Sequence, residues 1–224
     1  MVVAPKSNGA VRICVDFTKL NKSVQRENYP LPRVEELLAG LEGSTVFSKM
    51  DANSGFWQIN LDTKSRELTT FITPFGRFQF RKMPFGISAA PEFFQRQMER
   101  ILQGLPGVLC MMDDILVFGK NIKEHDQRLE KAMQRLRDSG LTLNKGKCEF
   151  RKNSIRFLGH IISSKGIHAD PEKVKAIHGM EPPSNKKELK KFLGMCNYLG
   201  KFSYCLAELE KPLRLLQKKS SAWL

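Results

Sequence analysis

The 224-residue chain is long enough to bury a sizeable core in one or two domains, and its 41% hydrophobic and 27% charged residues are typical of a globular protein. Its 37 Lys and Arg against 23 Asp and Glu give a formal net charge of +14, which favours a polyanionic partner such as nucleic acid, with a merely solvated basic surface as the alternative. No apolar run reaches the roughly 18–20 residues that cross a bilayer, and no signal peptide opens the chain. The five cysteines form no C-x-x-C pair. We therefore expect an intracellular protein, cytoplasmic or nuclear, that is neither secreted nor bound to a membrane.

The first hundred residues mix strand and helix patterns. Alternating apolar residues predict strands, and apolar residues spaced by three and four predict helices. In chain order we expect a half-buried strand over 11–17, a helix over 34–41 that stops at Gly43, a strand that ends at Asp51, a second strand after the irregular connection 53–55, a hairpin that turns at 74–76, and a helix over 90–104.

The stretch GVLCMMDDILVFG, residues 107–119, places Asp113 and Asp114 inside an apolar run. Two adjacent ionised carboxylates are costly in an apolar interior unless a turn exposes them or a cation neutralises them. Strong β-formers flank the pair, so we expect a tight hairpin with the carboxylates at its tip. A polar turn with exposed aspartates is the alternative.

Asp51 also lies at the end of a predicted strand. If this strand lies beside the hairpin, Asp51, Asp113 and Asp114 meet. Oxygen ligands of this kind select Mg²⁺ or Mn²⁺ over zinc. Two such ions about 3.5–4 Å apart can activate an attacking hydroxyl and stabilise the leaving oxygen of a phosphoryl displacement.

The second half of the chain also combines helix and hairpin patterns. Asn121 and Glu124 resemble a capping box, and the following helix should turn Ile122, Leu129, Met133 and Leu136 inward before it closes at 139–140. A hairpin is predicted over 157–167, and a domain boundary in GMEPPSNKKEL. Beyond that boundary Asn185 and Glu188 start a helix with an apolar face, Leu189, Phe192, Leu193 and Cys196, and a basic face, Lys186, Lys187, Lys190 and Lys191. Mixed strands and helices with few β-α-β alternations predict an α+β fold.

Several segments, in order, resemble the reverse transcriptase of gypsy-type LTR retrotransposons. They are VRICVDFTKLNKSVQRENYPLPRVEELLAGLEGSTVFSKMDANSGFWQI, TPFGRFQFRKMPFGISAAPEFFQRQM, MMDDILVFGKNIKEH, KCEFRKNSIRFLGHIISSKGIHADPEKVKAI and KKELKKFLGMCNYLGKF. The resemblance covers nearly the whole chain. It implies a right-hand polymerase of fingers, palm and thumb, with an antiparallel palm sheet packed on helices.

The resemblance also implies functions for individual residues. Asp51, Asp113 and Asp114 would be the catalytic carboxylates and the ligands of two Mg²⁺ ions, with Mn²⁺ as a possible substitute. The residues implied for dNTP binding are Lys6, Arg12, Ala52, Phe56, Phe85 and Gly86. Those implied for contact with primer and template are Met111, the primer-grip residues Phe157, Leu158, Gly159 and His160, and the thumb residues Lys186, Lys187, Lys190 and Lys191.

The chemistry of some of these residues suits the implied role. A bulky ring at Phe56 would clash with a ribonucleotide 2′ hydroxyl, and the Arg12 guanidinium suits bidentate phosphate binding. The alternatives are a core aromatic at Phe56, a solvated loop lysine at Lys6, and ordinary core residues at Phe157 and Leu158. Two residues depart from relatives: Met111 stands where the family has tyrosine, and Phe85 stands where retroviral enzymes have glutamine.

The resemblance divides the chain into partial fingers and the start of the palm over 1–48, a palm over 49–165, and a thumb-like helical region over 166–224. The palm portion would include the remaining fingers segment at about 62–90 and the primer-grip hairpin at about 155–165. We expect an RNA-directed DNA polymerase domain that takes dNTPs and an RNA or DNA template with primer, with RNase H, integrase and protease domains in a longer parent chain. Because the fingers lack the family's N-terminal segment, a catalytically inactive, nucleic-acid-binding remnant is the alternative.

Overall fold

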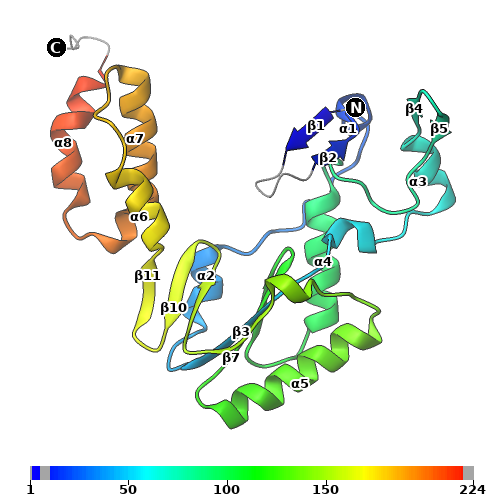
Figure 1. Ribbon diagram of the computed structural model, residues 1–224, viewed down its shortest axis with the longest axis horizontal. Coiled ribbons are helices and arrows are strands. Elements are labelled where there is room, and N and C mark those ends of the chain that lie inside the picture. Colours follow the sequence, from blue (N-terminus) through cyan, green and yellow to red (C-terminus); the bar gives the residue numbers. More distant parts are fainter. Residues whose placement is uncertain (1, 6–10, 219–224) are drawn as a thin grey trace. The chain divides into compact units, whose positions relative to one another are not determined.

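The computed structural model describes residues 2–5 and 11–218. The chain divides into two compact units, Met1–Ile155 and Arg156–Leu224 (Figure 1), and each is described by itself. None of the described helices is long and apolar enough to cross a membrane.

The centre of the first unit is a four-stranded antiparallel sheet in the order β6-β7-β3-β8. Its strands are β3 (Val46–Asp51), β6 (Val108–Met111), β7 (Asp114–Gly119) and β8 (Glu149–Lys152). The pairing of β3 with β7 runs without interruption from Val46 opposite Gly119 to Asp51 opposite Asp114. The predicted strand into Asp51 and the predicted hairpin with its aspartate tip are both confirmed.

Two helices, α4 (Ala90–Leu102) and α5 (Ile122–Asp138), pack on this sheet. Met50 of β3, Ile115 of β7, Met98 of α4 and Leu136 of α5 are each at most 1% exposed and belong to one apolar cluster. Because alternate residues of a strand point to opposite faces, Met50 and Ile115 mark the face that the helices cover.

The helix start predicted at Asn121 is confirmed, although Glu124 bonds the backbone N–H of Lys120 and not that of Asn121 as in a strict capping box. The side-chain oxygen of Asn121 accepts a hydrogen bond from the Glu124 backbone N–H at 2.9 Å, and Glu124 accepts one from the Lys120 N–H at 2.7 Å. The inward position predicted for Ile122 is wrong, because its side chain is 60% exposed. Ile122 lies in the first turn, one turn before His125, the first buried residue of the helix.

The second strand predicted after Asp51 is also wrong. The chain instead forms a short 3-10 helix, Gly55–Gln58, followed by a single β-bridge between Asn60 and Lys82. The Gln58 amide explains the turn, because it donates to the Asn53 carbonyl at 2.8 Å and accepts from the Thr142 N–H at 2.7 Å. These bonds fold the chain back on itself where a strand would continue.

The remaining elements of this unit are small. They are the antiparallel pair β1 (Val2–Pro5) and β2 (Val11–Cys14), the helices α1 (Thr18–Asn21), α2 (Val34–Ala39) and α3 (Thr63–Leu68), the hairpin of β4 (Phe71–Thr73) and β5 (Gly76–Phe78), and a second 3-10 helix, Lys145–Lys147. The hairpin that was predicted to turn at 74–76 is confirmed. The helix predicted over 34–41 ends four residues before Gly43, at Ala39.

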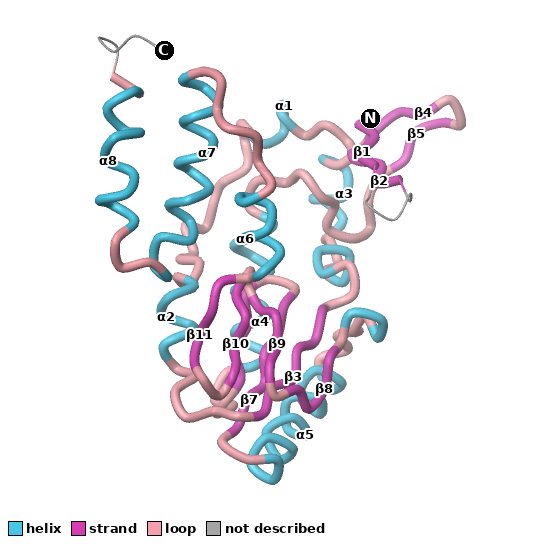
Figure 2. Tube along the Cα trace, turned by 60° about the vertical axis from the view of Figure 1, so that its left-hand side comes forward, coloured by secondary structure: helices cyan, strands magenta, loops and turns pink. Residues whose placement is uncertain are grey.

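In its described part, the second unit consists of an antiparallel meander of strands followed by helices (Figure 2). The strands are β9 (Ser154–Phe157), which begins two residues before the unit boundary, β10 (His160–Ser163) and β11 (Gly166–Ala169), and the helices are α6 (Pro171–His178), α7 (Lys186–Leu199) and α8 (Leu206–Leu216). The single hairpin predicted over 157–167 is therefore part of two consecutive hairpins. The predicted cap at Asn185 is confirmed, because its side chain accepts from the Glu188 N–H at 2.9 Å.

The close packing of β7 against α5 can be tested at Gly119. A methyl group added there would lie 2.6 Å from the backbone nitrogen of His125, so Gly119→Ala should lower the free energy of unfolding by about 1–3 kcal/mol. Gly194 of α7 has open space around it, and Gly194→Ala should raise that free energy by about 0.5–1 kcal/mol. Urea unfolding followed by circular dichroism measures both, and equal stabilities for Gly119→Ala and the parent would contradict the packing.

Candidate active site

Three carboxylates are brought to one end of the central sheet by strand register. Asp51 is the last residue of β3 and pairs with Asp114, the first residue of β7. Asp113 lies in the turn before β7, and its carbonyl oxygen accepts a hydrogen bond from the Ala52 N–H at 2.7 Å. The backbone thus joins the two strand ends that hold the acidic residues.

The turn that contains Asp113 is tightly constrained. Met112 adopts a left-handed backbone conformation with φ of 55°, which is unfavourable for a residue with a side chain. The Met112 N–H donates to the side-chain oxygen of Gln95 on α4 at 2.7 Å. On the other side of Asp113, a methyl group added to Gly55 would lie 1.9 Å from Asp113 Oδ1, so only glycine fits there without displacing the carboxylate.

The electrostatics of the site disfavour two of the ionised carboxylates. Burial and the nearby charge of Asp51 raise the pKa of Asp113 above its ordinary value, and Asp114 adds to this effect. Burial is also the main cause that raises the pKa of Asp114, while the charge of Lys49 opposes it. A nearby cation would reverse both shifts.

Lys147 supplies part of that positive charge. Its ammonium group bonds both carboxylate oxygens of Asp51, at 3.3 and 3.1 Å, although the two residues are 96 positions apart in sequence. The Asp51 side chain is 15% exposed and the Lys147 side chain 64%. The ion pair therefore lies at the solvent edge of the site.

The donor set suits a divalent cation in its chemistry. Asp113 Oδ1 is buried and has no hydrogen-bond partner among the described residues, which is an unfavourable state for a carboxylate oxygen. Hard oxygen donors are the ligands that Mg²⁺ and Mn²⁺ prefer. Within residues 2–5 and 11–218, however, no three His, Cys, Asp or Glu side chains are grouped so that they could hold a metal ion as they stand. Asp51 is instead paired with Lys147.

A cluster of aromatic rings lies next to the carboxylates. The centroid of the Phe56 ring is 5.3 Å from that of Phe85 and 5.6 Å from that of Phe94 on α4. Phe85 is half-buried, and exposed Gly86 follows it with φ of 98°. The Gly86 carbonyl accepts from the Asn21 side chain at 2.8 Å, which holds this segment near the end of α1. The structure thus brings Phe56 and Phe85 together.

Of the other residues predicted to contact the nucleotide, Ala52, Arg12 and Lys6, the structure describes the side chain of Ala52 alone. Ala52 is 1% exposed, so its side chain belongs to the core and only its backbone borders the carboxylates. Arg12 lies on β2, and Lys6 lies outside the described residues.

The residues predicted to contact primer and template lie mainly in the second unit. Leu158 and Gly159 both have positive φ, 48° and 75°, as in the two-residue turns that join adjacent antiparallel strands. Phe157 and His160 flank this turn and are each 1% exposed. Of the four α7 lysines, Lys187, Lys190 and Lys191 are exposed, and Lys186 is half-buried with its ammonium donating to the Lys218 carbonyl at 2.7 Å. Met111, on β6 in the first unit, pairs with Asp114.

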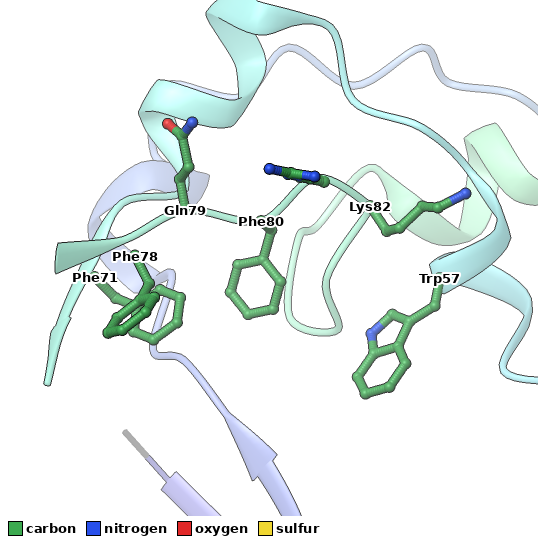
Figure 3. Close-up of a pocket in the computed structure, with 7 residues that line it drawn as sticks. Trp57, Phe71, Phe78, Gln79, Phe80 and Lys82 are labelled. Carbon is green, nitrogen blue, oxygen red and sulfur yellow. The ribbon is translucent and has the colours of Figure 1, made fainter. Parts of the chain in front are cut away.

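Sequence analysis missed three features near the site. Lys147 gave no local signal, because its partner Asp51 is distant in sequence. Gln95 could have been noticed as a polar residue three positions before Met98 on the inward face of α4. The third feature is a hollow of about 440 Å³ between the 3-10 helix and the β4–β5 hairpin, lined by Trp57, Phe71, Phe78, Gln79, Phe80, Arg81 and Lys82 (Figure 3).

Comparison with known proteins supports the architecture. The profile of the family described as "Reverse transcriptase (RNA-dependent DNA polymerase)" matches residues 4–162. The Tf2-3 and Tf2-4 transposon polyproteins of Schizosaccharomyces pombe are each 38% identical to this chain over 225 residues, which cover 100% of the chain and 17% of each polyprotein.

Solved structures give the same result. A foamy viral protease-reverse transcriptase in complex with double-stranded DNA is similar with a TM-score of 0.90 and 26% identity, over 96% of this chain and 38% of that one. A second such structure, with an RNA/DNA hybrid, has a TM-score of 0.85 and 25% identity, over 98% of this chain and 30% of that one. The predicted α+β polymerase fold is confirmed. The chain belongs to the reverse transcriptase family, and it spans 17% of the length of the polyproteins it matches.

The raised pKa of Asp113 predicts a pH-dependent effect of Asp113→Asn. Below the ordinary carboxyl pKa of 3.8 both the folded and the unfolded chain keep the proton, so burial has no charge to disfavour. As pH rises through the folded-state pKa, ionisation destabilises the fold, and asparagine removes this cost. Without divalent cations, Asp113→Asn should therefore be more stable than the parent at pH 7, by a margin that shrinks toward pH 4.

Asp62 provides a control of opposite sign. It caps α3, and its hydrogen bonds with Ser65 lower its pKa. A lowered pKa contributes stability above pH 3.8 that is lost on acidification, so Asp62→Asn should be less stable than the parent at pH 7 and similar at low pH. Urea unfolding at several pH values measures both variants. A margin for Asp113→Asn that does not change with pH would contradict the assignment.

Proposed function

We propose that this chain is an RNA-directed DNA polymerase domain that adds dNTPs to the 3′ hydroxyl of a primer. The observation that carries the proposal is the pairing of Asp51 with Asp114 beside the turn that holds Asp113. In a reverse transcriptase fold this arrangement places three acidic residues at one sheet end, beside the Phe56–Phe85 ring pair.

We assign Asp51, Asp113 and Asp114 as the ligands of two Mg²⁺ ions, which Mn²⁺ can replace. Bound ions would neutralise the triphosphate, activate the primer hydroxyl and stabilise the leaving pyrophosphate. The chain's own contribution is orientation: the β3–β7 ladder positions Asp51 and Asp114, and Lys147 holds the Asp51 carboxylate.

The incoming nucleotide is assigned to the region around Phe56, Phe85 and Gly86. The Phe56 ring, held between Phe85 and Phe94, would exclude a 2′ hydroxyl and so favour deoxynucleotides. Arg12 and Lys6 are assigned to the triphosphate, and the backbone of Ala52 to the floor of the site.

Primer and template are assigned to two sets of residues: Phe157, Leu158, Gly159 and His160 at the turn between β9 and β10, and the α7 lysines Lys186, Lys187, Lys190 and Lys191. The structural relatives are described in complex with double-stranded DNA and with an RNA/DNA hybrid. Exposed lysines on α7 suit contacts with phosphates, which position a duplex without selecting its sequence. In the hollow of Figure 3, aromatic rings beside Arg81 and Lys82 offer the groups that stack on bases and neutralise phosphates.

The domain assignment follows from the same proposal. Residues 1–48 would form part of the fingers and the start of the palm, 49–165 the palm with a fingers segment and the primer grip, and 166–224 the thumb. Protease, RNase H and integrase domains are the partners expected in a longer parent polyprotein, because the similar transposon proteins are polyproteins.

A second candidate is a nucleic-acid-binding domain without catalysis. Two observations favour it: Asp51 is paired with Lys147, and no three His, Cys, Asp or Glu side chains among the described residues are grouped so that they could hold a metal ion. Both candidates predict salt-sensitive binding to a primer–template, because phosphate contacts release counterions. Only the polymerase predicts extension of the primer.

Asp113→Asn should abolish Mg²⁺-dependent dNTP addition to a primed RNA template while binding to the same template persists. Removing one metal-binding carboxylate prevents charge neutralisation at the reacting phosphate, whereas phosphate contacts elsewhere remain. Asp138→Asn, which makes the same substitution at an exposed position of α5, is the matched control. Extension by Asp113→Asn at the parental rate would remove the mechanism, and no extension by the parent would favour the second candidate.

Phe56→Ala should reduce discrimination against ribonucleotides by about ten- to a hundredfold, since the ring that blocks the 2′ hydroxyl is gone. The measurement is the ratio of kcat/KM for a dNTP to that for the matching ribonucleotide. Phe150→Ala, on β8, removes a ring that is 45% exposed and should leave the ratio unchanged. An unchanged ratio in Phe56→Ala would refute the role of this ring.

A further inference from the structure

A row of polar contacts crosses α4 and ends at the aspartate turn. On one side of the helix, Glu99 accepts a hydrogen bond from the Tyr29 hydroxyl. The other oxygen of Glu99 accepts from the Gln95 amide at 2.8 Å. Gln95 then contacts the turn itself, so the row joins the segment before α2 to the residues around Asp113.

Gln95 bonds the backbone at two points just before Asp113. Its Nε2 donates to the Cys110 carbonyl at 3.1 Å, at the end of β6, and its Oε1 accepts from the Met112 N–H at 2.7 Å. The side chain is 0% exposed and lies beside Phe94 and Met98 in the apolar cluster. A buried amide is costly unless its donors and acceptor are used, and here both ends of the amide are bonded.

The hydrogen bonds of Gln95 hold a segment of backbone that is in an unfavourable conformation. Met112 is in the left-handed region without being glycine, and such residues persist only where neighbouring contacts hold them. The next residue is Asp113, so the backbone that Gln95 holds also determines where that carboxylate lies. The Cys110 thiol adds a weaker contact by donating to the Met112 carbonyl at 3.4 Å.

Glu99 and Tyr29 fix which way the Gln95 amide points. A carboxylate only accepts hydrogen bonds, so Glu99 orients the NH₂ group toward itself and leaves the oxygen for Met112. The Tyr29 hydroxyl in turn holds Glu99. Two further ion pairs, Arg26 with Glu92 and Glu27 with Arg96, fasten the segment of Tyr29 along α4.

We propose that Gln95 is a positioning residue for the polymerase reaction, that it fixes the turn preceding Asp113, and that the Tyr29–Glu99 pair sets the orientation of its amide. This inference rests on the proposed function of Asp113. Gln95 acts through the turn and touches neither substrate nor metal. Its loss should therefore affect the metal-dependent step and leave nucleotide affinity nearly unchanged.

Gln95→Met keeps the length of the side chain and removes its hydrogen bonds. We expect kcat to fall by about tenfold to a hundredfold, because a displacement of about 1 Å in a reacting group has effects of this size. The KM for dNTP should stay within about twofold, since Phe56 and Phe85 are untouched, and the Mg²⁺ concentration for half-maximal rate should rise. Gln97→Met, two residues along α4, is the matched control, because the half-buried Gln97 side chain makes no hydrogen bond within the described part of the chain.

Binding of Mn²⁺, followed by electron paramagnetic resonance without substrate, gives a readout that does not depend on catalysis. Gln95→Met should bind Mn²⁺ more weakly than the parent and Gln97→Met equally well. Tyr29→Phe should cause a smaller loss of kcat and of Mn²⁺ affinity, with no further loss when combined with Gln95→Met. If Gln95→Met fails to fold, Tyr29→Phe alone decides, because it leaves the buried amide in place.

The possible outcomes separate this inference from the proposed function. If the parent extends primers and Gln95→Met keeps the parental kcat and Mn²⁺ affinity, positioning by Gln95 is wrong and the function stands. A rise in KM with unchanged kcat would also overturn it. If the parent extends no primer, the proposed function fails and the role of Gln95 in the reaction fails with it. The Mn²⁺ affinities then decide only whether Gln95 positions Asp113: weaker binding in Gln95→Met supports this and equal binding refutes it.

Discussion

The register of β3 against β7 is the constraint on which the site depends. Side chains alternate along a strand, so a slip of either strand by one residue would turn Met50 or Ile115 out of the core and carry Asp51 away from Asp114. The apolar cluster that α4 and α5 form with these strands strongly disfavours such a slip. Packing at the middle of the sheet thereby determines the position of charged groups at its end, several residues away.

The same arrangement has an energetic cost. Burial, together with the charge of Asp51, raises the pKa of Asp113 and of Asp114, so their ionised forms oppose folding. Gly55 permits this closeness because any larger residue would meet the Asp113 carboxylate. Without a cation, the ionised carboxylates destabilise the fold, while the backbone around them is firmly held. A bound cation would remove this electrostatic cost, so the site is suited to bind one.

Sequence patterns predicted the site where its determinants are local. The β-formers on both sides of Asp113 and Asp114 indicated the hairpin, and Asn121 with Glu124 indicated the start of α5. Patterns failed where a distant side chain decides the backbone, as with Gln58, whose bonds to Thr142 produce a 3-10 helix where a strand was expected. The pairing of Lys147 with Asp51 could not be predicted either, because neither segment alone indicates the strand order that brings β8 beside β3.

Buried polar side chains complete what apolar packing begins, and they do so on both sides of β3. Toward β8, Ser48 Oγ accepts from the Arg151 N–H at 3.0 Å and lies 2.9 Å from His125 Nε2, while Asp126 bonds both His125 and Arg151. This network fastens β8 to β3 and so keeps the segment that contains Lys147 near Asp51. Apolar contacts are not directional and would tolerate small shifts, whereas hydrogen bonds to a single atom would not. The precision of the carboxylate site therefore depends on a few polar groups inside the core.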